Sequence, residues 1–95
     1  MGTAMQIEHD SKARRFVAEL PVGTAYLAYA KADEKVLDFY STFVPPPARG
    51  QNVAAKLVEA ALGYARENGF RIIPSCWYVA LWIQRHPEHD DLLAH

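Results

Sequence analysis

The sequence predicts an α+β fold with a mixed sheet, in which an antiparallel meander is followed by a β-α-β-α unit. Three observations support this prediction. Apolar residues alternate with a period of two in the first half, three consecutive prolines interrupt the chain at residues 45–47, and a helical period follows them. Ninety-five residues are enough for a single domain, which we expect to span residues 1–95.

The first half is predicted to form the meander. Phe16, Ala18 and Leu20 share one face of a strand over residues 15–20. Two further strands are expected over residues 24–31 and 35–44, with turns at 21–23 and 32–34 and a short strand over 6–9 before them. In the strand over residues 35–44, the alternation puts Leu37, Phe39 and Phe43 on one face.

The second half is predicted to contain two helices and one short strand. Proline cannot donate to a strand ladder, so the run at residues 45–47 ends the meander. A helix is expected from about Asn52 to Gly69, and a short strand follows over residues 70–74. Ser75 is expected to cap a second helix that Pro87 ends. This second helix is apolar nearly all round, which favours deep burial, cover over a ligand, or contact with a partner protein or a second copy of the chain.

Composition excludes several classes of function. A net charge of −1 argues against a general nucleic-acid binder, because such proteins carry a basic excess. The longest strongly apolar stretch, residues 76–83, is too short to span a bilayer, and we expect no membrane association. One cysteine, Cys76, cannot form an internal disulfide, so a reducing cytoplasm is the expected compartment.

The start of the first predicted helix has the features of an anion site. No acidic residue occurs between residues 39 and 58, whereas Arg49 and Lys56 flank the first turn. Two cations at the positive end of a helix dipole are unfavourable unless an anion sits there. Small residues and free backbone N–H groups suit a phosphate at this point. The alternative is that Gly50 is simply a turn glycine and Arg49 a solvated charge.

A resemblance to a known family favours the anion site over the turn-glycine alternative. The segment Arg49-Gly50-Gln51-Asn52-Val53-Ala54 resembles the R/Q-x-x-G-x-G/A signature of the GNAT acetyltransferase superfamily, with Asn52 in place of the central glycine. Asparagine tolerates a left-handed backbone best among non-glycine residues, so the loop is expected to survive the change. The pattern Pro74-x-Cys76-x-Tyr78-Val79, followed by His86-Pro87-Glu88, is similar to small single-domain GNAT-like proteins. The resemblance covers roughly residues 34–92.

The resemblance implies a truncated GNAT-like fold that binds acetyl-CoA. In that superfamily the strand before the loop splays from the next parallel strand, and pantetheine lies in the gap. For this sequence, the resemblance implies that backbone groups of Phe43 and Val44 bind pantetheine. It also implies that a backbone N–H near Val44 stabilises the developing oxyanion. The pyrophosphate is then held by Arg49, Gly50, Gln51, Asn52, Val53 and Ala54.

Two side chains are candidates for catalysis. Cys76 is expected near a helix N-terminus, which favours a thiolate, and it would take the acetyl group itself in a two-step route. A lone cysteine in an apolar segment is alternatively a small core residue. Tyr78 is a candidate to protonate the leaving thiolate, or else a packing residue. Pro87 breaks the spacing between His86 and His89, so we expect no metal site.

The leading functional hypothesis is an acetyl-CoA-dependent N-acetyltransferase. The N-terminal helices that build the acceptor site in the superfamily are absent from the predicted fold. This favours either an open pocket that takes an exposed peptide or protein amine, or a pocket supplied by a partner. A non-catalytic CoA-binding module and a protein-interaction domain that docks through the second helix are the alternatives.

Overall fold

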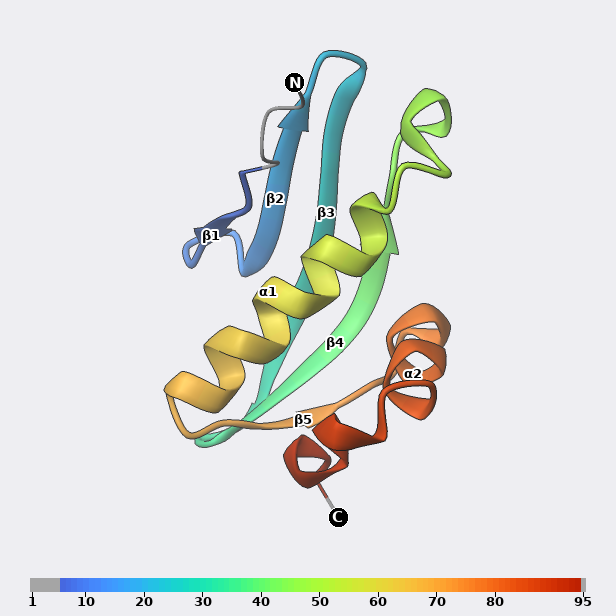
Figure 1. Cartoon of the computed structure of the whole chain (residues 1–95). Coiled ribbons are helices and arrows are strands. Elements are labelled where there is room, and N and C mark those ends of the chain that lie inside the picture. The colour runs from blue at the N-terminus through green and yellow to red at the C-terminus, as the bar shows by residue number, and fades with distance from the viewer. Residues whose placement is uncertain (1–5, 95) are drawn as a thin grey trace.

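A five-stranded sheet with helices packed against it makes up the fold (Figure 1). The computed structural model describes residues 6–94. The strands lie side by side in chain order: β1 Glu8–Asp10, β2 Arg15–Leu20, β3 Gly23–Asp33, β4 Val36–Phe43 and β5 Arg71–Ile73. The first four are antiparallel, and β5 pairs with β4 in parallel after helix α1, Val53–Glu67. The predicted α+β fold with a mixed sheet is therefore confirmed.

The strands agree with the alternation of the sequence except for the position of one turn and the face on which Phe43 lies. The turn expected at residues 32–34 is wrong by about two positions, because Asp33 still pairs with Val36 and the turn falls on Glu34 and Lys35. The carboxylate of Asp33 accepts the backbone N–H of Glu34 at 2.7 Å, which stabilises the shifted turn. The prediction that Phe43 shares a face with Leu37 and Phe39 is also wrong, because β4 contains an irregularity before it.

Strand β4 contains a β-bulge at Tyr40. Ala28 pairs with Ser41 and the next residue of β3, Tyr29, pairs with Phe39, so Tyr40 is an extra residue without a partner on β3. One extra residue reverses the alternation beyond it. Thr42 consequently shares a face with the core residue Leu27, while Phe43 lies beside Tyr26 on the other face, with ring centroids 5.7 Å apart.

The hydrophobic core lies between one face of the sheet and α1, which crosses that face diagonally (Figure 1). The helix contributes an apolar stripe at helical spacing, as predicted, and the strands contribute every second residue. Fully buried side chains of the two layers include Leu27, Phe39, Leu57, Val58, Leu62 and Ile72. This packing fixes the position of the first turn of α1 over the end of β4.

The C-terminal segment folds back onto the same side of the molecule. Helix α2, Trp77–Gln84, follows β5, and a 3-10 turn, η2, spans Pro87–Leu92. The prediction that Ser75 caps α2 is wrong: the cap position is Cys76, and its side chain makes no capping hydrogen bond. Arg66 of α1 anchors η2 through a two-pronged ion pair with Asp91, at 2.7 and 3.0 Å.

Helix α2 is buried on one side only. Val79, Trp82 and Ile83 face the core, whereas Trp77 at its start is largely exposed. Neither helix in residues 6–94 has the combined length and apolar character needed to cross a membrane.

An aromatic cluster holds the edge strand β1 onto the sheet. His9 stacks on Phe16 with ring centroids 4.4 Å apart and meets the edge of Tyr64 at 4.3 Å. Its Nε2 forms a 2.6 Å hydrogen bond with the hydroxyl of Tyr29. Burial lowers the pKa of His9 below its ordinary value of 6.5, against a smaller opposing effect of Asp10.

This lowered pKa predicts acid sensitivity. Because the unfolded chain binds a proton at His9 more readily than the folded chain, stability contributed by the neutral side chain is fully present above pH 6.5. It is lost as the pH falls below 6.5 toward the folded-state pKa. Urea unfolding between pH 8 and pH 5 should therefore show a decline that is shallower in His9→Gln. Equal slopes for the two proteins would contradict this role of His9.

Candidate functional site

The loop between β4 and α1 is an ordered turn. Pro46–Ala48 form a single 3-10 turn, η1, closed by hydrogen bonds from Ala48 N to Pro45 O (2.9 Å) and Arg49 N to Pro46 O (3.1 Å). Pro45 is buried against the β2–β3 turn, where its ring lies 3.4 Å from the position a Cβ would take at Gly23. The proline run therefore both ends β4 and fixes the path of the chain toward α1.

The start of α1 depends on two left-handed residues. Gly50 has φ +88° and Asn52 has φ +66° with ψ +21°. The expectation that Asn52 takes the glycine-like conformation of the loop is confirmed. Asparagine is suited to this position because its short polar side chain tolerates a positive φ at little cost.

The N-terminus of α1 keeps its backbone donors available. The first intrahelical bond runs from Lys56 N to Asn52 O at 3.2 Å, so the N–H groups of the preceding turn have no helical acceptor. Within the described residues, no side chain caps this end and no acidic side chain lies in the first turn. Uncapped donors combined with the positive end of the dipole attract an anion.

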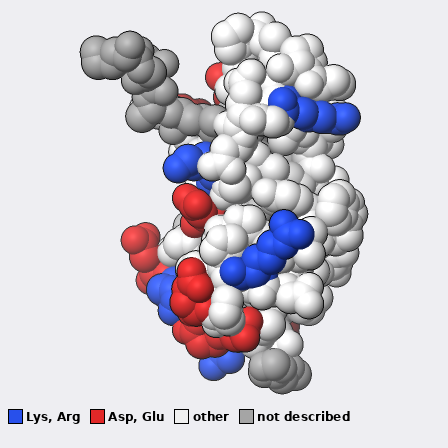
Figure 2. Space-filling model, turned by 45° about the vertical axis from the view of Figure 1, so that its right-hand side comes forward, with Lys and Arg blue, Asp and Glu red and all other residues white. Residues whose placement is uncertain are grey.

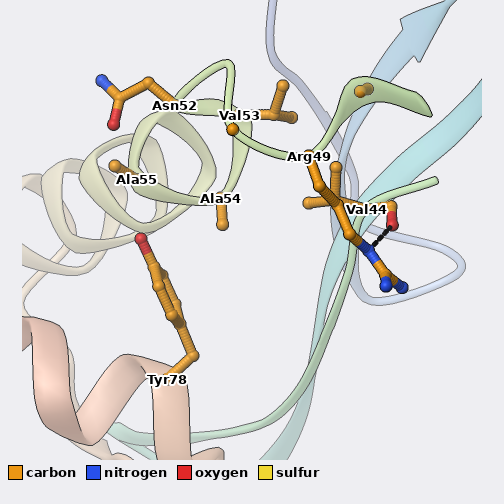
Figure 3. A pocket seen from close by; sticks show the side chains of 9 residues that line it. Val44, Arg49, Asn52, Val53, Ala54, Ala55 and Tyr78 are labelled. Atoms are coloured by element: carbon orange, nitrogen blue, oxygen red, sulfur yellow. Dashed lines mark hydrogen bonds between the residues drawn. The ribbon is translucent and has the colours of Figure 1, made fainter. Parts of the chain in front are cut away.

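A cavity of about 370 Å³ opens directly below this helix start. Figure 3 shows it between Val44 and Arg49 on one side and Tyr78 of α2 on the other. Its wall is formed by Val44, Ala48, Arg49, Gly50, Asn52, Val53, Ala54, Ala55 and Tyr78. The structure thus brings together six of the eight residues expected to bind the cofactor. Gln51 and Phe43 are exposed and lie outside the wall.

The cavity exists because β4 and β5 separate. Their parallel pairing covers only Val36 to Asp38 on β4, and the last link is a 2.8 Å hydrogen bond from Cys76 N to Phe39 O. The bulge at Tyr40 follows at once, and bulges bend the strand that carries them. In the described part of the chain, residues 41–43 pair only with β3, so the other edge of β4 borders the cavity.

Arg49 joins the strand to the loop. Its Nε donates to the carbonyl of Val44 at 3.0 Å, and Figure 3 shows the guanidinium beside that carbonyl. The side chain is exposed, so the planar group keeps donors turned toward solvent at the rim of the cavity. Arg49 therefore stabilises the turn and places positive charge near the helix start at the same time.

Tyr78 crosses the cavity from the opposite side. Figure 3 shows its hydroxyl pointing toward the first turn of α1. Burial raises the pKa of Tyr78 above its ordinary value of 10.0, with Arg85 acting in the opposite direction. The hydroxyl is therefore a proton donor at neutral pH. Behind it lies an adjoining hollow of about 280 Å³, which shares Asn52, Ala55 and Tyr78 with the cavity and adds Glu59, Leu81, Trp82, Arg85 and His86.

Cys76 lies close to the cavity without forming its wall. Its residue is 7% exposed, and Sγ is 3.4 Å from the hydroxyl of Thr42. Thr42 faces this way only because the bulge reverses the alternation of β4. The structure thus places Cys76 in the core, at the point where β4 and β5 separate, with its Sγ beside the hydroxyl of Thr42.

Charged side chains outside the cavity wall are spread unevenly over the surface. Figure 2 shows basic side chains standing apart from one another on this face, while acidic side chains gather toward its lower left edge. Among residues 6–94, no three His, Cys, Asp or Glu side chains meet in a way that could hold a metal ion. His86 is occupied otherwise: it stacks on Trp82 at 3.8 Å and its Nδ1–H donates to the carbonyl of Trp82 at 2.7 Å.

Comparison with known proteins assigns the family. The family model described as GCN5-related N-acetyl-transferase matches residues 15–92, which include strands β2 to β5, the cavity and both helices. The chain belongs to this family. Its relatives include Protein NATD1 of Gallus gallus, 32% identical over 90% of this chain and 80% of that protein, and Protein NATD1 of Homo sapiens, 30% identical over 90% and 78%.

A solved structure agrees on the fold. The NMR solution structure of a GCN5-like candidate N-acetyltransferase from Staphylococcus aureus superimposes with a TM-score of 0.76. The alignment covers 95% of this chain and 88% of that one, at 24% sequence identity. The resemblance to the GNAT superfamily and the GNAT-like fold inferred from the sequence are therefore confirmed.

Ala48 is a wall residue without a sequence signal: it lines the cavity through its small size, which no motif records. Ala55, also in the wall, is one of the small residues expected at the helix start together with Gly50 and Ala54. The pairing of Thr42 with Cys76 depends on the bulge at Tyr40. The one trace of that bulge in the sequence is Tyr40 itself, an aromatic residue at a position where strict alternation predicts a solvent-facing side chain.

The left-handed backbone at position 52 yields a test of the loop. Asn52→Val should lower the free energy of unfolding by about 1–2 kcal/mol, because a β-branched side chain is strained at positive φ. Asn52→Gly should cost less, since glycine adopts this conformation freely. Gln51→Val, at the exposed neighbouring position, is the matched control in guanidinium unfolding. Equal costs for the two valine variants would show that position 52 is not strained.

Proposed function

We propose that this chain is an acetyl-CoA-dependent N-acetyltransferase that transfers acetyl to an amine. The observation that carries the proposal is the uncapped start of α1, which opens onto a cavity of about 370 Å³ beside an unpaired edge of β4. Membership of the GCN5-related family and the matching fold support it. Acetyl-CoA supplies an acetyl group activated as a thioester.

The pyrophosphate is assigned to the first turn of α1. Backbone N–H groups from Gly50 to Ala54 are proposed to bind it, since no side chain caps this helix end and the left-handed residues Gly50 and Asn52 shape the loop. The guanidinium of Arg49 adds a charged donor at the rim. We assign Gln51 to the same group because it stands in the loop, although its side chain points to solvent.

The pantetheine arm is assigned to the edge of β4 that β5 leaves unpaired. Backbone groups of Phe43 and Val44 are proposed to pair with it as a neighbouring strand would, because β5 does not pair with this part of β4. A backbone N–H near Val44 then stabilises negative charge that develops on the acetyl oxygen. The Cys76–Phe39 hydrogen bond closes the split below, which limits how deep the arm can reach.

Tyr78 is proposed to protonate the leaving thiolate. Of the nine residues in the cavity wall, only Arg49 and Tyr78 carry titratable side chains, and a guanidinium does not give up its proton at neutral pH. The direct route is favoured over acetylation of Cys76, because Cys76 is buried, hydrogen-bonded to Thr42 and outside the wall.

Tyr78→Phe tests both the activity and this assignment. In an assay of CoA release from acetyl-CoA with an amine panel, the variant should lose about 100-fold in kcat, since one general acid contributes 10²–10⁴-fold. The KM for acetyl-CoA should change far less. Cys76→Ala is the matched control on the same helix turn: it should keep most of the turnover, and the intact wild-type protein should gain no acetyl mass.

Three outcomes would contradict parts of this account. Binding of CoA without any turnover by the wild-type protein would point to the non-catalytic module instead. A Tyr78→Phe variant altered only in KM would make the hydroxyl an anchor for the cofactor. Loss of turnover in Cys76→Ala, together with an acetyl adduct that this variant lacks, would favour the two-step route through Cys76.

A further inference from the structure

The face of the sheet that points away from the helices carries apolar side chains. Every buried residue of α1, α2 and η2 belongs to one core cluster, which the strands join through one face only. Within residues 6–94, Val17 and Ala28 are the two buried apolar residues outside that cluster, at 7% and 8% exposed. Because they alternate with the core residues Phe16 and Leu27 along β2 and β3, they lie on the opposite face, which we call the open face.

Strand register shows which other side chains lie on the open face, since cross-strand partners point to the same side of a sheet. Its apolar members by this register are Val17, Tyr26, Ala28, Ala30, Phe43 and Ile73. Phe43 and Ile73 are large and remain 39% and 36% exposed. An antiparallel sheet that faces water usually carries polar residues on its wet side. The apolar open face therefore indicates a surface that another molecule covers.

Two opposite charges flank the middle of the open face. Arg15 of β2 pairs with Ala28 and Asp38 of β4 pairs with Ala30, so one charge lies on each side of β3. Among the described residues, Nε of Arg15 and Oδ1 of Asp38 are both shielded from solvent and have no hydrogen-bond partner. Shielded polar atoms without a partner are rare in folded proteins, which indicates that these two atoms are paired in a larger assembly.

We propose that the open face is the interface between two copies of this chain, related by a two-fold axis that lies between the two sheets and runs along β3. Such an axis places β2 of each copy over β4 of the other. Arg15 then faces Asp38 of the second copy, with an offset of two residues along the strand, about 7 Å, which a long arginine side chain can span. Because a two-fold interface uses the same surface twice, both charge pairs form together.

The remaining side chains of the open face suit the packing of one sheet on another. Ala28 and Ala30 keep the middle of the face flat, and the rings of Tyr26 and Phe43 lie beside it with centroids 5.7 Å apart. Two twisted sheets pack face to face with their strands at about 30° to each other. The open face covers little more than β2 to β4, and small interfaces give weak dimers, so we expect association between about 10 µM and 1 mM.

Reversal of the two charges tests the interface by sedimentation velocity. The mass of the wild-type protein should rise with concentration from the 10.7 kDa of one chain toward twice that value. Arg15→Asp and Asp38→Arg should each raise the dimer Kd at least about 100-fold, because each variant brings like charges together twice. An equimolar mixture of the two variants should dimerise again, since the mixed dimer restores opposite charges at both contacts.

Two controls separate the interface from effects of folding and net charge. Glu67→Arg reverses an exposed charge on α1, on the other side of the sheet, and should dimerise as the wild type does. Dilution of the wild-type protein, followed by backbone NMR, needs no variant. It should shift amides of Tyr26, Ala28 and Ala30 and leave those of the α1 start in place.

A wild-type mass that stays at 10.7 kDa at the highest concentration would overturn the proposal. So would a mixture of the two folded variants that stays monomeric, or single variants that dimerise as the wild type does. Dilution shifts confined to α2 would assign self-association to the exposed Trp77 instead. The cavity is lined by α1 and α2 on the other side of the sheet, so each of these outcomes leaves the proposed acetyl transfer standing.

Discussion

Parallel pairing between β4 and β5 stops at a single backbone hydrogen bond, from Cys76 to Phe39, and the rest of the site depends on that stop. A fully paired sheet would leave no room beside α1, because neighbouring strands lie only about 4.8 Å apart. The bulge at Tyr40 bends β4 away directly above this bond, and the proline turn keeps the chain from returning. The cavity is therefore built into the backbone, and side chains only line it.

The helix start and the split strand act together. α1 packs through its apolar stripe onto the sheet, so its first turn lies at the end of β4, where the edge is free. Left-handed Gly50 and Asn52 allow the chain to turn sharply into α1, and both residues line the cavity. We propose that these two regions bind the phosphate end and the amide-bearing arm of one elongated ligand.

Much of this arrangement could be predicted from the sequence. Alternation predicted the meander and helical spacing predicted α1, and both are present; the acid-free helix start flanked by Arg49 predicted the uncapped helix end, while the anion expected there stays a prediction. The bulge at Tyr40 was missed because an inserted residue changes the register without changing composition. That error misplaced Phe43 and hid the contact between Thr42 and Cys76, since both depend on which way the strand alternates beyond residue 40. Ser75 was expected to cap α2 from residue type alone, but Cys76 holds the cap position because its N–H pairs with β4.

Fragments of the cofactor provide the most direct test of the central claim, that the α1 start and the β4 edge bind two parts of one molecule. Backbone NMR spectra are recorded with adenosine 3′-phosphate 5′-diphosphate, with pantetheine, and with CoA. The first ligand should shift amides of Gly50 to Ala54, the second those near Phe43 and Val44, and CoA both sets. Unshifted amides in both segments at saturating CoA, or shifts confined to the α1–α2 hollow around Arg85 and His86, would contradict the account.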